Sequence, residues 1–287
     1  MDREFQRLFL RKIHDKGLRQ ADMALSWGHG ARGFIVAAGK RLEVAAFGPP
    51  PEAAPTLVML HEGLGCVALW RGFPAKLAKA TGWGVFAYSR TGYGASDPVA
   101  APRPLDYMTR EARDVLPVVL GAIGFRRGVL LGHSDGASIA AIYAGEHNDL
   151  RVAGLVLIAP HLFTEPAGLA SIAEAKRAYE SGDLRTRLAK YHADVDNAFY
   201  GWNGAWLDPG FKSWNIEAFV DRWRAPALLI QGEDDPYGTL AQISAIRTRA
   251  PTAVKTLILP GCRHSPHLEQ PEATMQAVAD FCARIES

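Results

Sequence analysis

The stretch GVLLGHSDGASIAAIYAGEH, residues 128–147, decides the fold of this chain. It begins with a run of apolar residues and glycine, which is typical of a strand buried on both faces of a sheet. Residues 137–147 continue as a helix of mostly small and apolar residues. Between them lies GHSDG, residues 132–136, which matches the pattern G-x-S-x-G. A strand that turns directly into a helix strains the central Ser134 and exposes its hydroxyl, and only glycine fits two residues to either side. The sequence therefore predicts that Ser134 is a nucleophile.

Similar apolar runs recur along the chain and alternate with helical patterns. The runs lie at residues 56–60, 84–89, 128–132, 154–159, 227–232 and 254–259. The helical patterns lie at residues 73–81, 108–120, 137–147, 239–249 and 272–285. This alternation predicts an α/β protein with a mostly parallel, doubly wound sheet that helices cover on both faces. Residues 34–37 and 42–47 flank an AGK turn and predict a leading antiparallel hairpin.

The alternation is interrupted once, by the 67 residues 160–226. They contain helical patterns at 169–181 and 183–194, followed by an aromatic-rich stretch. A structureless loop of that length is uncommon, so the segment predicts a helical cap inserted between two core strands. We expect an N-terminal helical extension at 1–30, a core formed by 31–160 and 224–287, and the cap at 161–223. The cap holds 11 of the chain's 27 Phe, Trp and Tyr residues, which indicates an apolar ligand pocket.

The composition excludes several classes of protein. With 48% hydrophobic and 22% charged residues in 287, the chain is typical of a globular protein rather than a disordered or fibrous one. A net charge of +2 without a long basic run gives no electrostatic reason to expect nucleic acid. No stretch of 18 apolar residues predicts a membrane span. Three widely separated cysteines and the lack of a secretory signal at the N-terminus favour a reducing, cytoplasmic location.

The N-terminal residues predict an amphipathic helix. The apolar Phe5, Leu8, Phe9 and Ile13 recur at helical spacing. We expect this helix to pack on the core or on a partner subunit, so a homodimer is one possibility. A membrane-surface helix is the alternative, which nearby acidic residues disfavour.

The nucleophile motif and the order of elements resemble the α/β-hydrolase family over residues 34–285. The resemblance implies a catalytic acid after the strand that follows the cap, and a base after the last strand. The acid segment GEDD, residues 232–235, resembles the family's G-x-x-D and points to Asp235, with Asp234 as the alternative. The base segment GCRHSPHLEQP, residues 261–271, points to its first histidine, His264, and gives His267 a structural role. Arg263 replaces the usual glycine there and either contacts substrate or points to solvent.

The loop HEGLG, residues 61–65, resembles the family's H-G-x-x-G loop, with Glu62 replacing the usual glycine. The resemblance implies an oxyanion hole formed by the backbone N–H groups of Gly63 and Asp135. Leu64 is the alternative donor if the loop is shifted.

The pocket predictions rest on position in the fold and on the composition of the cap. Function collects at the carboxyl ends of strands in an open α/β sheet, so Leu64 and His161 are predicted to line the pocket. The aromatic-rich cap over that edge adds Trp202, Trp206 and Trp214. We expect no cofactor, because the G-x-G at Gly92 and Gly94 lacks the third glycine of a dinucleotide site. We expect no metal, because the two histidines of the H-x-x-H at 264–267 have no third ligand at a suitable spacing.

Three functional hypotheses follow. The first is a serine hydrolase that cleaves small apolar carboxylic esters through an acyl-enzyme. The second keeps the triad but cleaves a thioester, an amide, a lactone or a carbon–carbon bond next to a ketone. The third is a ligand-binding protein of this fold with little turnover. The resemblance disfavours haloalkane dehalogenase and epoxide hydrolase chemistry, because both use aspartate where this chain has Ser134.

Overall fold

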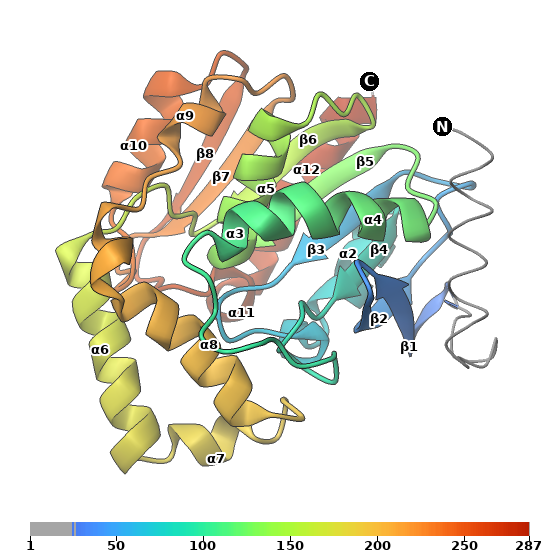
Figure 1. Cartoon of the computed structure of the whole chain (residues 1–287). Coiled ribbons are helices and arrows are strands. Elements are labelled where there is room, and N and C mark those ends of the chain that lie inside the picture. The colour runs from blue at the N-terminus through green and yellow to red at the C-terminus, as the bar shows by residue number, and fades with distance from the viewer. Residues whose placement is uncertain (1–24, 26, 287) are drawn as a thin grey trace.

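The computed structural model describes residue 25 and residues 27–286. Its centre is an eight-stranded sheet in the order β1-β2-β4-β3-β5-β6-β7-β8 (Figure 1). The strands are β1 (His29–Ala37), β2 (Lys40–Phe47), β3 (Thr56–Leu60), β4 (Gly84–Tyr88), β5 (Gly128–His133), β6 (Val152–Ile158), β7 (Ala227–Gly232) and β8 (Val254–Leu259). β2 pairs antiparallel with both β1 and β4, and the remaining pairs are parallel. The predicted mostly parallel sheet with a leading hairpin is confirmed.

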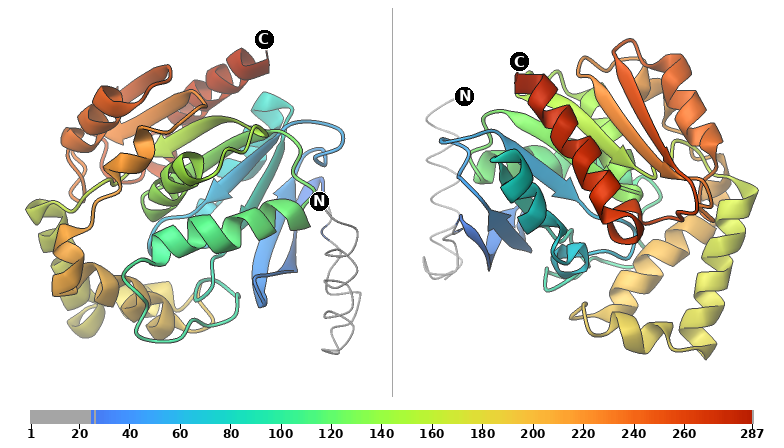
Figure 2. Two further views of the ribbon diagram at one scale, coloured as in Figure 1. Left: turned by 45° about the horizontal axis from the view of Figure 1, so that its top comes forward. Right: turned by 180° about the vertical axis from the view of Figure 1, so that it is seen from behind.

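Helices cover both faces of the sheet, which explains why every residue of β3, β4 and β5 is buried. α2 (Phe73–Thr81) and α12 (Pro271–Glu286) pack together on one face, as the right-hand view of Figure 2 shows. The other face carries α3 (Tyr107–Arg110), the π-helix Glu111–Val115, α4 (Leu116–Ala122), α5 (Asp135–Glu146) and α10 (Leu240–Arg249). Burial on both faces removes the alternation of polar residues that a half-exposed strand would show.

The segment between β6 and β7 is helical, as expected. It contains α6 (Pro166–Ser181), α7 (Leu184–Leu188), α8 (Val195–Leu207), the turn Pro209–Ser213 and α9 (Glu217–Val220). The helix expected at 183–194 is wrong in its extent, because α7 ends at Leu188 and a new helix starts after Asp194. The Asp194 side chain caps α8 by accepting a hydrogen bond from the Asn197 N–H at 2.9 Å.

We call residues 161–223 the cap segment; its boundaries as a separate unit stay a prediction. Figure 1 shows α6, α7 and α8 together beyond one end of the sheet. The remaining short elements are Val67–Trp70 after β3 and α11 (Pro266–Glu269) after β8. Among the described residues, no helix combines the length and apolar character needed to cross a bilayer. The helix expected around residues 5–13 falls outside the described range, and the last residues of the expected extension, from His29 on, belong to β1.

Candidate active site

Ser134 lies at the sharp turn between β5 and α5. Its φ angle is 53°, in the left-handed region that residues with a side chain rarely adopt. A methyl group on Gly132 would overlap the backbone of Gly136, and one on Gly136 would overlap the carbonyl of Leu60. The two glycines of the motif are therefore required by close backbone packing. The Ser134 N–H donates to the Ile158 carbonyl at 2.9 Å, which fixes the turn to the neighbouring strand.

His264 and Asp235 meet at the same end of the sheet. The His264 Nδ1–H donates to the Asp235 carboxylate, 2.8 Å from Oδ2 and 2.9 Å from Oδ1. The carboxylate also accepts from the Gln231 amide at 2.7 Å and the Tyr237 N–H at 2.8 Å. Burial opposes ionisation of Asp235, but the hydrogen bond and charge of His264 outweigh it and lower the carboxyl pKa. An ionised, fixed acid therefore orients the imidazole, while the neighbouring Asp234 is exposed.

Ser134 and His264 share a cavity of about 230 Å³ at the carboxyl ends of the strands. The cavity is lined by Glu62, Gly63, Leu64, Ser134, Asp135, His161, Ile172, Trp202, Trp206, Tyr237, His264 and Ser265. The predicted Trp214 is not part of this lining. It packs behind Trp206, with ring centroids 5.7 Å apart, and stacks on Phe211 at 5.1 Å. Trp214 therefore supports the cavity wall from outside.

The backbone N–H groups of Gly63, in the loop after β3, and Asp135, at the start of α5, form no hydrogen bond with the described residues. The N–H of Leu64, the alternative donor, is likewise without a partner among them. The loop is held by His61, whose Nε2 accepts from the Arg90 N–H at 3.0 Å while its Nδ1–H donates to the Glu62 carbonyl at 2.7 Å. Burial and the neighbouring Arg90 lower the pKa of His61, as this neutral tautomer requires.

A buried arginine behind the cavity was not predicted. Arg90 is 1% exposed, donates to the carbonyls of His61 and Glu62, and lies 3.8 Å from the Asp135 carboxylate. Asp135 also accepts from the Tyr107 hydroxyl at 2.5 Å and the Trp206 indole N–H at 3.3 Å. Asp135, the residue after Ser134, is thus tied to both the loop after β3 and the cap segment. The one feature of the sequence that the network accommodates is the acidic residue directly after Ser134.

His133 and His267 lie near His264, but neither of them lines the cavity that contains Ser134. His133 donates from Nε2 to the His264 carbonyl at 2.7 Å, and its Nδ1 lies 3.4 Å from the Glu62 carboxylate. His267 is buried against Trp70, at a ring distance of 4.9 Å. Arg263 points to solvent beside Glu269. No group of three or more His, Cys, Asp or Glu in the described part of the chain is arranged to hold a metal ion.

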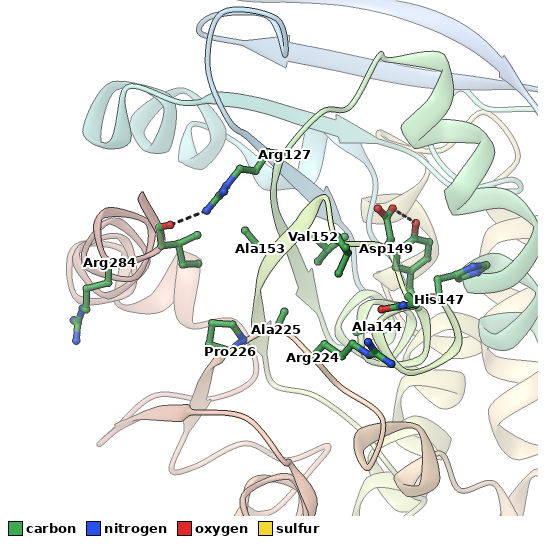
Figure 3. Close-up of a pocket in the computed structure, with 14 residues that line it drawn as sticks. Arg127, Ala144, His147, Asp149, Val152, Ala153, Arg224, Ala225, Pro226 and Arg284 are labelled. Carbon is green, nitrogen blue, oxygen red and sulfur yellow. Dashed lines mark hydrogen bonds between the residues drawn. The ribbon is translucent and has the colours of Figure 1, made fainter. Parts of the chain in front are cut away.

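A larger cavity, of about 360 Å³, lies at the opposite end of the sheet, before β5, β6 and β7 (Figure 3). The Arg127 guanidinium there donates to the Ile285 carbonyl at 3.0 Å. Asp149 accepts from the Tyr143 hydroxyl at 2.7 Å and forms a two-pronged pair with Arg151. None of the predicted site residues lies in this cavity.

The comparison with known proteins gives a family match over most of the chain. A family profile described as "Alpha/beta hydrolase family" matches residues 57–277. The chain is 28% identical over 240 residues to a non-heme haloperoxidase from Rhodococcus erythropolis, covering 72% of this chain and 83% of that protein. It is 23% identical over 296 residues to epoxide hydrolase 3 from Xenopus tropicalis, covering 89% of this chain and 79% of that protein.

Among solved structures, the chain is similar to the esterase RhEst1 from Rhodococcus sp. ECU1013. The TM-score is 0.68 at 20% identity, over 88% of this chain and 99% of that one. At this level of identity the similarity concerns the fold alone.

Proposed function

The chain belongs to the α/β-hydrolase family, and on that premise we propose that it is a serine hydrolase of small, largely apolar carboxylic esters. Ser134, His264 and Asp235 form the proposed triad. The observation that carries the proposal is the shared cavity: the strained Ser134 and the Asp235-bonded His264 both line it. A serine hydroxyl is a weak nucleophile and needs a base; His264, which lines the same cavity, is the base that we propose.

The proposed reaction proceeds in two halves. Ser134 Oγ attacks the ester carbonyl carbon while His264 Nε2 takes its proton, and Asp235 stabilises the imidazolium that forms. The negative charge on the carbonyl oxygen is stabilised by the N–H groups of Gly63 and Asp135. The tetrahedral intermediate collapses, His264 returns the proton to the leaving alcohol, and an acyl-enzyme remains. Water, deprotonated by His264, then releases the acid and regenerates Ser134.

The choice of serine favours acyl transfer over the epoxide opening named for one relative. A carboxylate that opens an epoxide forms an ester, which water can hydrolyse. A serine hydroxyl would instead form an ether, which His264 and water have no means of cleaving. Ser134 therefore suits a substrate with a carbonyl carbon.

The cavity favours a small substrate. Its volume of about 230 Å³ lies below the roughly 300–1,000 Å³ of typical ligand pockets. Leu64, Ile172, Trp202 and Trp206 provide apolar walls, three of them from the cap segment. We propose that this segment selects the substrate. Thioesters, amides, lactones and carbon–carbon bonds next to a ketone remain the alternative substrates of the same triad.

A fluorophosphonate probe tests the triad directly. It should label wild type and fail to label Ser134→Ala, and a panel of 4-nitrophenyl esters of increasing acyl length should show turnover that declines for long chains. Absence of labelling in wild type, or equal labelling of the variant, would contradict the proposal. Labelling with negligible turnover on every ester would favour an alternative bond or a binding function.

A further inference from the structure

The active-site cavity contains a histidine that the proposed reaction does not use. His161 follows β6 and is 5% exposed, with its carbonyl held by the Ser138 hydroxyl at 2.6 Å. Its ring lies 5.3 Å from Trp206 and 5.8 Å from His264, measured between centroids. Neither ring nitrogen has a hydrogen-bond partner among the described residues, although buried imidazoles normally have one. The ring therefore has hydrogen-bonding capacity left for a molecule in the cavity that it lines.

A second ring in the same cavity has a free donor. Trp202, on α8, is 7% exposed, and its indole nitrogen packs so closely on Gly63 that a methyl group there would overlap it. Within the described part of the chain, this indole N–H has no acceptor. By contrast, the Trp206 N–H donates to the Tyr107 hydroxyl at 3.0 Å, and the Trp223 N–H to the Ala141 carbonyl at 2.9 Å. Buried indoles usually find such an acceptor, so the substrate is the natural partner for Trp202.

The charge around these rings favours an uncharged partner. Burial, reinforced by the nearby His264, lowers the pKa of His161 to about 3, so its imidazole is neutral near pH 7. The cavity lining includes the acidic Glu62 and Asp135 and contains neither lysine nor arginine. Arg90 lies behind the lining and is already 3.8 Å from the Asp135 carboxylate, so a second carboxylate on the substrate would find no cation in the lining with which to pair.

We propose that the ester substrate carries, close to its scissile carbonyl, a second uncharged oxygen that accepts hydrogen bonds from His161 and Trp202. The oxygen belongs to an ether, a ketone or a hydroxyl group. This inference rests on the proposed esterase function and refines it, because an ester with no further oxygen offers these donors only its alkoxy oxygen, a poor acceptor, and so leaves them inadequately paired. Such unpaired groups let a site discriminate strongly against a substrate that lacks the matching oxygen.

Two isosteric pairs of esters test the inference. The acyl pair is 4-nitrophenyl methoxyacetate and 4-nitrophenyl butanoate, and the alcohol pair is 2-methoxyethyl acetate and n-butyl acetate. Within each pair, an ether oxygen replaces one methylene group. The measured quantity is the ratio of kcat/KM values within a pair, compared between wild type and His161→Phe or Trp202→Phe. Comparing enzymes cancels the intrinsic reactivity of the esters.

We expect the ratio of at least one pair to fall roughly three- to tenfold in the variants, the effect of one hydrogen bond. The pair that responds identifies the half of the substrate that bears the oxygen. Ile172→Val, which alters the cavity wall without removing a polar group, should leave both ratios unchanged. His161→Gln, which keeps a hydrogen-bonding side chain, should recover part of the preference.

The outcomes separate this inference from the function on which it rests. Turnover with ratios that neither variant changes would overturn the inference and leave the esterase function standing. Turnover of neither pair by wild type would overturn both. Circular dichroism and fluorophosphonate labelling of Ser134 check that each variant folds, and Trp202→Phe tests the same ratios if His161→Phe does not fold.

Discussion

The two cavities of this protein lie at opposite ends of one sheet and differ in what lines them. The larger, at the amino ends of the strands, contains Asp149, whose carboxylate pairs with Arg151. It also contains the Arg127 guanidinium, which donates to the Ile285 carbonyl (Figure 3). The smaller, at the carboxyl ends, contains a strained serine, a histidine–aspartate pair and several ring and backbone N–H groups without partners. Available polar groups, rather than volume, therefore distinguish the candidate active site, as expected for an open α/β sheet.

The strongest way to break this comparison is to remove the nucleophile. Ser134→Ala should lower kcat for the best 4-nitrophenyl ester by roughly 10⁴- to 10⁶-fold, because the members of the proposed triad would act as a unit. Steady-state kinetics measure the loss, and thermal unfolding should show a folded variant. A variant that retains a tenth of the wild-type activity would place the chemistry elsewhere.

The next largest effect on kcat is expected from replacing the proposed catalytic acid. Asp235→Asn removes the carboxylate that orients His264 and should lower kcat by about 10⁴-fold. Asp234→Asn is a matched control, since its side chain is exposed one residue earlier in the same turn, and kcat should change less than twofold. If Asp234→Asn is the more damaging substitution, the assigned triad is wrong.

At the carboxyl-end cavity, the sequence predicted the three proposed triad residues better than the residues that surround them. Ser134, Asp235 and His264 each follow a strand-like run, so local pattern and strand topology together place them at one edge. Arg90 and Tyr107 were missed because their contacts with the loop after β3 and with Asp135 span distant parts of the chain.

The arrangement of the aromatic side chains in the cap segment was predicted less well, although the sequence contains the helical spacing of the buried residues of α8. The buried Ala198, Phe199, Trp202, Ala205 and Trp206 of α8 recur at helical spacing, yet their aromatic character suggested only a ligand pocket. Trp214 was assigned to the pocket on composition. Which aromatic side chains face a cavity, and which pack behind others, depends on how α8 and the turn after it are placed, and composition does not specify this.

The buried His267 predicts how the stability of the protein depends on pH. Burial, and then the neighbouring His133, lower the pKa of His267 to about 3, against about 6.5 in the unfolded chain. Below pH 6.5 the unfolded state binds a proton that the folded state excludes, so wild type loses stability as the pH falls toward 3. The free energy of unfolding of wild type relative to His267→Leu should fall by about 2 kcal/mol between pH 7.5 and 5. Urea titrations at the two pH values measure it, and a constant difference would contradict the prediction.

A smaller effect is expected from the tryptophans, and it tests which of them form the cavity wall. Trp206→Leu opens the wall beside Ser134 and should shift the preference between short and long acyl chains roughly three- to tenfold. Trp214→Leu should lower the melting temperature with the acyl preference unchanged, because its ring packs behind Trp206. Measuring kcat/KM across the ester panel distinguishes the effect of Trp206→Leu from that of Trp214→Leu. Equal shifts in acyl-chain preference would show that Trp214 also lines the cavity.

The smallest expected effect concerns the larger cavity. Arg224 lines it and forms no hydrogen bond or ion pair with the other described residues, so it is the group there most available to a ligand. Arg224→Ala should change kcat/KM on the ester panel by less than twofold, because the length of the strands separates it from Ser134. The melting temperature should also stay within about 1 °C, since exposed side chains without partners contribute little. A tenfold change in kcat/KM would show that the amino-end cavity is coupled to the chemistry, and the distinction between a working end and a supporting end of this sheet would then fail.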